Sequence, residues 1–232
     1  MLEVRDIHTF YGTSHILFGV SLSVNKSEVV ALLGRNGAGK TTTIRSIMGL
    51  TPPKMGSIIF KGEEIRGLRP YQIAKRGIGL VPAGRRIFPK LTIRENLEIA
   101  KKPPTSEAEG WTLEKIYDLF PRLKERENQA GGTLSGGEQQ MLAIGRALMG
   151  NPEFLILDEP VEGLSPIMVG LVRDQLLKLK AQGMTMLLSE GNSTFAMRLS
   201  DRGYVLDKGV VKYHGTTKEL GESEEVRSYL AL

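Results

Sequence analysis

Short apolar runs alternate along this chain with segments of helical periodicity. The runs are bounded by glycine or polar residues, as buried β-strands are, and they cover residues 29–33, 58–60, 78–81, 154–157, 184–188 and 204–206. Apolar residues recur at three- and four-residue spacing after Gly39 and after Pro166, and Gly49 and Gly183 end these two patterns. Strands that alternate with helices predict a parallel sheet covered on both faces.

Three stretches depart from this alternation. Residues 1–24 and 58–65 alternate apolar with polar side chains and predict antiparallel strands. Residues 92–148 show helical periodicity without a buried strand. Within them, the polar, proline-bearing stretch 101–106 predicts a surface loop.

Together these patterns predict a single α/β domain over residues 1–232. Residues 1–82 and 152–232 are expected to form the core with the parallel sheet and an antiparallel β subdomain. Residues 83–151 are expected to form an inserted α-helical lobe.

Composition narrows the class of protein. Of 232 residues, 41% are hydrophobic and 25% charged, which is typical of a water-soluble globular protein. The apolar runs are too short to cross a bilayer, the first residues do not resemble a signal peptide, and no cysteine is present. A net charge of +5 permits binding to nucleic acid or an anionic membrane, but such a small surplus is more typical of a solvated surface. The 27 glycines exceed the usual share of roughly 7% and indicate loops in which backbone approaches a ligand.

One such loop fits the phosphate-binding pattern G-x-x-x-x-G-K-[ST] at residues 34–41. Its glycines let backbone amides turn toward phosphate oxygens, and the following helix N-terminus adds partial positive charge. Lys40 would reach the β- and γ-phosphates, and the Thr41 hydroxyl would ligate Mg²⁺. A chance glycine turn is the alternative, but a strand before the loop and a helix after it favour phosphate. The candidate residues are Gly34, Arg35, Asn36, Gly37, Ala38, Gly39, Lys40, Thr41 and Thr42.

A buried strand at 154–157 ends in two carboxylates, Asp158 and Glu159. Ligands of open α/β sheets lie beyond the carboxyl ends of the strands, where these two residues fall. Asp158 would hold the metal through water, and Glu159 is suited to act as the general base on an attacking water. Taken alone, the pair would be read as solvated acids at a strand end; the phosphate loop changes that interpretation.

A second anion site is predicted at the start of another helix. Ser135 and Glu138 form the S-x-x-E pattern of a capping box. Gly136 and Gly137 leave the first-turn amides bare, so this helix end is suited to bind an anion. An ordinary capped helix is the alternative interpretation.

These motifs, in this order, resemble the ATP-binding cassette (ABC) family, whose signature is LSGGQ, with Glu138-Gln139 as a familiar variant. The resemblance covers nearly the whole chain and implies a RecA-like P-loop NTPase core that uses ATP and Mg²⁺. It assigns Tyr11 to stacking on adenine, and Ser135, Gly136, Gly137 and Glu138 to the signature. Residues 84–89, 117–123, 141–149 and 201–206 are similar to the ATPase subunits of branched-chain amino acid importers.

The resemblance also implies partners. In the family each ATP lies between the loop of one chain and the signature of another, so one copy of each implies a homodimer or a heterodimer with a second ABC ATPase. Transmembrane permease subunits would dock near residues 83–96, and a periplasmic solute-binding protein would act indirectly. The chain would therefore lie peripherally at the cytoplasmic face of the inner membrane.

Other functions remain as alternatives. ATPases for urea or amide import and for lipopolysaccharide export look similar, because the membrane subunits decide the cargo. A soluble ATP-gated clamp acting on nucleic acid or ribosomes is disfavoured, since such relatives carry long coiled coils or two cassettes, and this chain shows neither heptads nor a repeat. We expect no nucleic-acid partner.

Three residues depart from the family pattern around the γ-phosphate. Ala83 stands where the family carries Gln or Glu, and Gly191 stands where it carries His or Gln. Val161 replaces a polar residue expected at the dimer seam. Each substitution removes a polar group but leaves the binding loops intact. We therefore expect normal ATP binding with a reduced intrinsic rate of hydrolysis.

Overall fold

The computed structural model describes residues 1–104 and 110–230, and within them the strands form two sheets. The smaller sheet has the order β2-β1-β4-β5 and its pairs are antiparallel. Its strands are β1 (Leu2–Tyr11), β2 (Ser14–Val24), β4 (Met55–Phe60) and β5 (Glu63–Glu64). The pairing is irregular between Val4 and Ile7, where Asp6 has a φ of 48°, so that both apolar side chains face the core. The prediction of antiparallel strands is confirmed.

The larger sheet has the order β10-β9-β3-β8-β7-β6. Its strands are β3 (Val29–Leu33), β6 (Ile78–Val81), β7 (Phe154–Asp158), β8 (Thr185–Glu190), β9 (Arg202–Asp207) and β10 (Val210–Thr216). The pairs from β9 through β6 are parallel, as the sequence predicts. The antiparallel edge strand β10 was not predicted, because its residues are only partly buried or exposed and do not form an apolar run.

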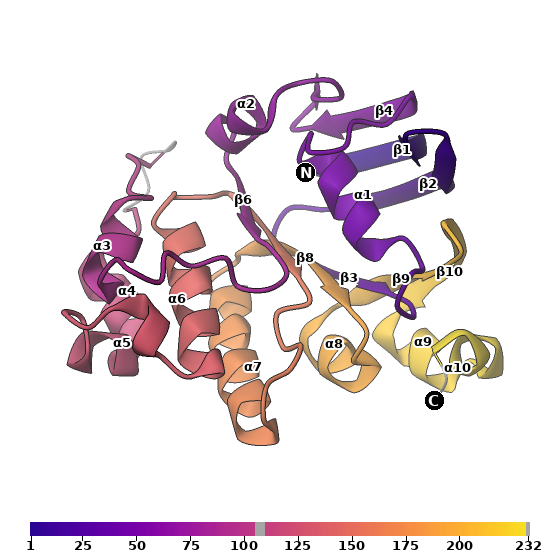
Figure 1. Ribbon diagram of the computed structural model, residues 1–232. Helices are drawn as coiled ribbons and strands as arrows, with labels where there is room; N and C mark the ends of the chain where they lie inside the picture. The colour runs from indigo at the N-terminus through magenta and orange to yellow at the C-terminus, as the bar shows by residue number, and fades with distance from the viewer. Residues whose placement is uncertain (105–109, 231–232) are drawn as a thin grey trace.

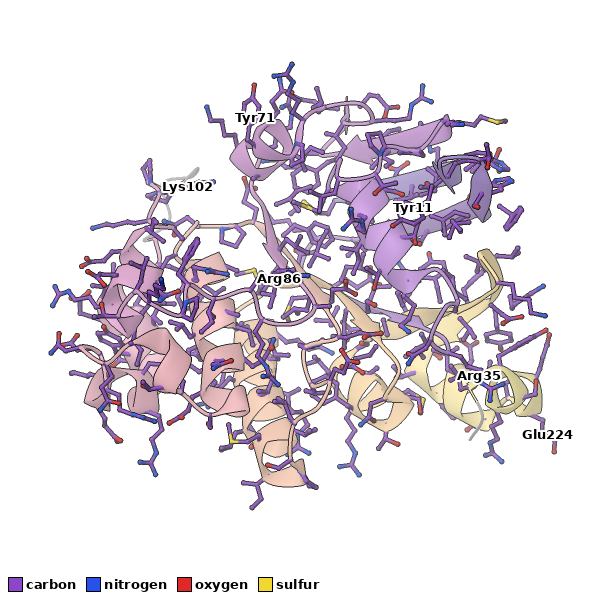
Figure 2. All side chains as sticks on the ribbon, viewed as in Figure 1. Tyr11, Arg35, Tyr71, Arg86, Lys102 and Glu224 are labelled. Carbon is purple, nitrogen blue, oxygen red and sulfur yellow. The ribbon has the colours of Figure 1, made fainter. Side chains whose placement is uncertain are left out.

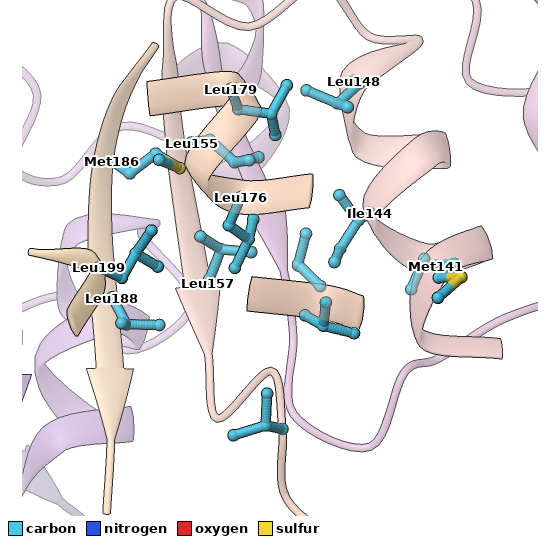
Figure 3. Packing of buried hydrophobic residues seen from close by; sticks show 14 of the residues in the cluster. Met141, Ile144, Leu148, Leu155, Leu157, Leu176, Leu179, Met186, Leu188 and Leu199 are labelled. Atoms are coloured by element: carbon cyan, nitrogen blue, oxygen red, sulfur yellow. The ribbon is translucent and has the colours of Figure 1, made fainter. Parts of the chain in front are cut away.

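Alternate residues of the parallel strands enter two separate cores. On one face, Phe154 and Ile156 pack with α1 (Lys40–Ile47) and the antiparallel sheet. On the other face, Leu155 and Leu157 pack in one cluster with side chains of α6 (Gly136–Leu148) and α7 (Pro166–Ala181), as Figure 3 shows. Every residue of β3, β7 and β8 is buried, which explains the apolar runs 29–33, 154–157 and 186–188 within them.

Helices cover both faces of the larger sheet (Figure 1). Helix α1 (Lys40–Ile47) lies between the two sheets and contacts strands of both. On the opposite face lie α7 (Pro166–Ala181) and α8 (Ser193–Leu199). The remaining helices of this part are α2 (Pro70–Lys75), α9 (Thr217–Glu222) and α10 (Glu224–Leu230).

Between β6 and β7 the described chain is helical, as predicted, and these helices gather at the left of Figure 1. They are α3 (Ile93–Glu98), α4 (Leu113–Leu119), α5 (Pro121–Glu125), the 3₁₀ turn η1 (Gly131–Thr133) and α6 (Gly136–Leu148). Their buried side chains belong to the same core as β7, α7 and α8. The exact limits of the lobe at 83–151 stay a prediction.

Two smaller expectations concern the surface. Residues 101–104 of the predicted loop are exposed and irregular, and residues 105 and 106 lie outside the described chain. Among the helices of the described residues, none combines the length and the apolar character needed to cross a membrane.

Candidate functional site

The loop between β3 and α1 is shaped by close contacts of its glycine backbone. A Cβ on Gly34 would lie 2.4 Å from the carbonyl oxygen of Leu206 in β9, so no larger residue fits there. Gly39 has a φ of 110°, which L side chains rarely adopt, and precedes α1 without a side-chain cap. The first-turn amides of α1 are therefore free of a capping side chain, as an anion site at a helix N-terminus requires.

Lys40 reaches back over this loop. Its Nζ donates to the carbonyl oxygen of Gly34 at 2.9 Å and lies 3.2 Å from Glu159 Oε1. The side chain is 4% exposed, so its charge is held in place by these partners. The ammonium thus lies where the phosphate loop meets the carboxyl end of β7.

The Thr41 hydroxyl donates to Asp158 Oδ1 at 3.2 Å. Burial raises the pKa of Asp158 above its ordinary value, although the hydrogen bond from Thr41 favours the charged form. A cation would stabilise this buried carboxylate, and a hydroxyl beside a carboxylate is a donor set that suits Mg²⁺. The predicted metal residues therefore lie together and fit a divalent cation.

Glu159 follows Asp158 in a backbone conformation that is unusual for a non-glycine residue, with a φ of 49°. Its N–H donates to the carbonyl oxygen of Ser189 at 2.9 Å, which anchors the turn to β8. This conformation directs the side chain to Lys40 and leaves it only partly buried. Such a carboxylate is accessible to a water beside the loop.

The other predicted loop residues divide between solvent and core. Arg35, Asn36 and Gly37 are exposed, whereas Ala38 and Thr42 are buried. The N–H of Gly209, in the turn between β9 and β10, donates to the carbonyl oxygen of Ala38 at 2.9 Å. This hydrogen bond holds the loop against the larger sheet, while the exposed residues at its tip remain accessible to a ligand.

Tyr11 ends β1 and is 43% exposed, so its ring is available for stacking. In Figure 2 it lies with the antiparallel strands, apart from Arg86 near the middle of the molecule. The same strand is joined to α1 by a hydrogen bond of 2.8 Å between the hydroxyls of Thr9 and Ser46. Tyr11 therefore stands on a strand that is fixed to the helix after the phosphate loop.

The predicted signature forms the expected helix start. Ser135 and Glu138 make a capping box at the N-terminus of α6. Arg126 Nη1 lies 3.0 Å from both carboxylate oxygens of Glu138, a contact that the sequence did not reveal. Burial alone would raise the pKa of Glu138, but the hydrogen bonds from Ser135 and Arg126 hold it below its ordinary value. This network fixes the two glycines at the helix start.

The structure brings only some of the predicted residues together. The phosphate loop, Asp158 and Glu159 meet at the carboxyl ends of β3 and β7. The signature lies elsewhere: α6 belongs to the helical group at the left of Figure 1, and α1 lies beside the antiparallel strands at the right. Two candidate anion sites on different parts of one chain are suited to a ligand shared between two chains.

The three departures occupy different surroundings. Val161 is 5% exposed, and its side chain packs in the core and not at the surface of the single chain. Gly191 is exposed, and a Cβ there would meet nothing within 4 Å. Ala83 is half-buried in the turn after β6. The chain therefore has room for a larger side chain at Gly191.

Sequence reasoning also missed Glu190. This residue ends β8, is 3% exposed, and accepts hydrogen bonds from the backbone N–H groups of Val161 and Asn192. Burial raises the pKa of its carboxyl group, although both N–H donors favour the charged form. The available signal in the sequence was a charged residue two positions after the apolar run 184–188.

Comparison with known proteins extends these findings. The ABC transporter family profile matches residues 17–162. The high-affinity branched-chain amino acid transport ATP-binding protein BraG of Pseudomonas aeruginosa is 43% identical over 227 residues, which are 98% of this chain and 97% of that protein. The lipopolysaccharide export system ATP-binding protein LptB of Haemophilus influenzae is 34% identical, over 98% of this chain and 95% of its own. A solved nucleotide-free ATP-binding cassette from an ABC transporter aligns with a TM-score of 0.86 and 28% identity, covering 100% of this chain and 98% of that one.

Proposed function

Because the chain belongs to the ABC transporter family, we propose that it is the ATP-hydrolysing subunit of a membrane importer for branched-chain amino acids. ATP hydrolysis coupled to transport follows from the family. The cargo rests on the 43% identity to BraG across almost the whole of both chains. The single observation that carries the chemistry is the meeting of Lys40 with Glu159 beside Thr41 and Asp158.

These residues divide the work of hydrolysis. The amides at the start of α1 bind the phosphates, and Lys40 exchanges its contact with the carbonyl oxygen of Gly34 for phosphate oxygens. Glu159 accepts a proton from the attacking water at its carboxylate. Tyr11 stacks on the adenine, which orients the nucleotide but takes no part in the chemistry.

Thr41 and Asp158 are the residues that would hold Mg²⁺, Asp158 through water. When bound, Mg²⁺ supplies positive charge that offsets the charge developing on the phosphate oxygens. The raised pKa of Asp158, caused by burial, supports this role because a cation lowers the free energy of the ionised carboxylate.

A second chain completes the site. Gly136 and Gly137 at the start of α6 offer anion-binding amides, and the capping box of Ser135 and Glu138, with Arg126, fixes them. These amides would contact the γ-phosphate held by the loop of the partner, so that ATP closes the dimer and hydrolysis reopens it. The partner is a second copy of this chain or a similar ATPase.

The permease would dock on the segment 83–96 that follows β6. This segment borders a groove of about 460 Å³ in which Phe88 and Ile99 are 46% and 62% exposed. Large apolar side chains that are exposed together at one groove favour a protein partner there. Docking there would place the chain at the cytoplasmic face of the inner membrane, with a periplasmic solute-binding protein acting on the permease from the other side.

The test is reconstitution of the chain with permease subunits in liposomes. We expect Mg·ATP to drive uptake of leucine, isoleucine or valine, and Glu159→Gln to abolish it. ATP hydrolysis without uptake of any of these amino acids would contradict the cargo but not the ATPase. Failure to hydrolyse ATP with the permease present would contradict the function as a whole.

The similarity to LptB supports lipopolysaccharide export as a second candidate. The same liposomes distinguish the two, since export requires extraction of a lipid from the bilayer and no uptake of a solute. Urea and small amides serve as a third arm of the uptake assay, because related ATPases import them.

A further inference from the structure

One buried carboxylate joins the turn after β7, which carries Glu159, to the turn after β8, which carries Gly191. Glu190 Oε1 accepts from the N–H of Val161 at 3.3 Å, and Oε2 accepts from the N–H of Asn192 at 2.9 Å. Val161 lies two residues after Glu159 in the turn after β7, and Asn192 lies in the turn after β8. The two oxygens of one side chain therefore hold two separate loops.

The surroundings of Glu190 make this contact rigid. Its residue is 3% exposed and pairs with Leu33, the last residue of β3 before the phosphate loop. The preceding residue, Ser189, accepts the N–H of Glu159. Consecutive residues of β8 thus fix alternate residues of the turn that carries the general base.

The second turn depends on the same carboxylate. Gly191 has no side chain to pack and is exposed, so its own contacts cannot fix its position. Its neighbour Asn192 is held twice, since its N–H donates to Glu190 and its side chain caps α8 by accepting from the N–H of Phe195 at 3.0 Å. The backbone around Gly191 is therefore placed by Glu190 and by the start of α8.

We propose that Glu190 is a positioning residue for hydrolysis, whose carboxylate fixes the turn of Glu159 against the turn of Gly191. This inference rests on the proposed ATPase function. Because Glu190 acts through backbone groups of the two turns, its loss moves the base relative to the bound nucleotide. A misplacement of about 1 Å can cost on the order of 10²-fold in rate.

The discriminating variant is Glu190→Gln, which keeps the size of the side chain. Its amide nitrogen is a donor and cannot accept from a backbone N–H, so one of the two turns is released. We expect kcat to fall by about 10- to 100-fold while the Kd for ATP stays within about twofold. Glu190→Asp keeps both acceptors on a shorter stem, and an intermediate kcat is expected.

Glu28→Gln is the matched control. Glu28 also accepts a backbone N–H, from Asn25 at 2.7 Å, and binds Arg202, but it precedes β3 at the opposite end of the strand from the phosphate loop. This variant should lower the midpoint of thermal unfolding without changing kcat. Single-turnover rates are divided by the amount of bound ATP, so that unfolded protein, which binds no ATP, does not lower the measured rate.

Three results would overturn the inference. The first is an unchanged kcat in Glu190→Gln, and the second is a loss of ATP affinity in that variant as large as its loss of kcat. The third is a loss of kcat in Glu28→Gln as large as the loss in Glu190→Gln. If Glu190→Gln fails to fold, the kcat of Glu190→Asp relative to its ATP affinity decides in the same way. If the wild-type protein hydrolyses ATP and the Glu190 variants have the same kcat, only this inference is contradicted. If the wild-type protein does not hydrolyse ATP, the proposed function itself is contradicted.

Discussion

Lys40 and Glu159 form an ion pair across the site, with Nζ of the lysine 3.2 Å from Oε1 of the glutamate. The lysine belongs to the start of α1 and the glutamate to the turn after β7, so the contact joins the predicted phosphate-binding group to the predicted base. Phosphate oxygens would compete with Glu159 for the same ammonium group. Nucleotide binding is therefore expected to release the carboxylate for its contact with water.

Replacing Lys40 by alanine should weaken ATP binding. A charge-assisted hydrogen bond contributes roughly 1.5–3 kcal/mol, which corresponds to about a 10- to 100-fold increase in Kd. Isothermal titration calorimetry measures the change, with the exposed Lys218→Ala in α9 as a control for the loss of one positive charge. Equal affinities of the Lys40→Ala and wild-type proteins would contradict the phosphate loop.

Blocking hydrolysis should trap a dimer. Glu159→Gln removes the base and the ion pair with Lys40 but keeps the loop and the signature, so ATP with Mg²⁺ would remain between two chains. Sedimentation velocity should show a dimer in ATP and Mg²⁺ and a monomer in ADP. A protein that stays monomeric in ATP at high concentration would require a different ATPase as partner.

Polar side chains restored near the γ-phosphate should speed hydrolysis. The double variant Ala83→Gln with Gly191→His supplies two groups that the family carries, and the structure leaves space for a Cβ at Gly191. Since one preorganised donor is worth on the order of 10²–10³ in rate elsewhere, we expect at least a tenfold rise in the single-turnover rate. The Kd for ATP should change little. Rates equal to wild type would show that neither side chain matters here.

Asp158→Asn should stabilise the nucleotide-free protein at neutral pH. Burial raises the pKa of Asp158 in the folded state, so folding is penalised while the group is ionised. The penalty is full above the folded-state pKa and vanishes below the unfolded value of about 3.9. The unfolding midpoint of the variant should therefore exceed that of wild type at pH 8, by about 2–4 °C per kcal/mol, and the gap should close as the pH falls below 4.

The same comparison in Mg·ATP gives the control. The wild-type protein should gain more stability from the ligand than Asp158→Asn, because the variant loses a carboxylate toward the metal. A variant that melts below wild type without nucleotide would show that the attraction of the ionised carboxylate to Thr41 and Lys40 outweighs the cost of burying the charge.

The parts of the molecule that the sequence predicts correctly are those with a pattern confined to a short stretch of the chain. The buried strands and the capping box of Ser135 and Glu138 each lie within a few residues of sequence, and the structure confirms them. The phosphate loop is equally local, and the structure places its residues between a buried strand and a helix, as the motif requires. The contact of Arg126 with Glu138 and the two bonds of Glu190 join separate segments. Neither pairing has a periodicity or a motif, because each depends on how folded elements meet.

The order of strands has a consequence for synthesis of the chain. The neighbours of β3 in the sheet are β8 and β9, and the N–H of Val29 bonds to the Asp201 carboxylate across 172 residues. The apolar strand before the phosphate loop therefore leaves the ribosome long before either pairing strand exists. Such an unpaired run is prone to aggregation. We expect nascent chains that stop short of β9 to require a chaperone, and the loop at Gly34 to take its final shape only after Leu206 has emerged.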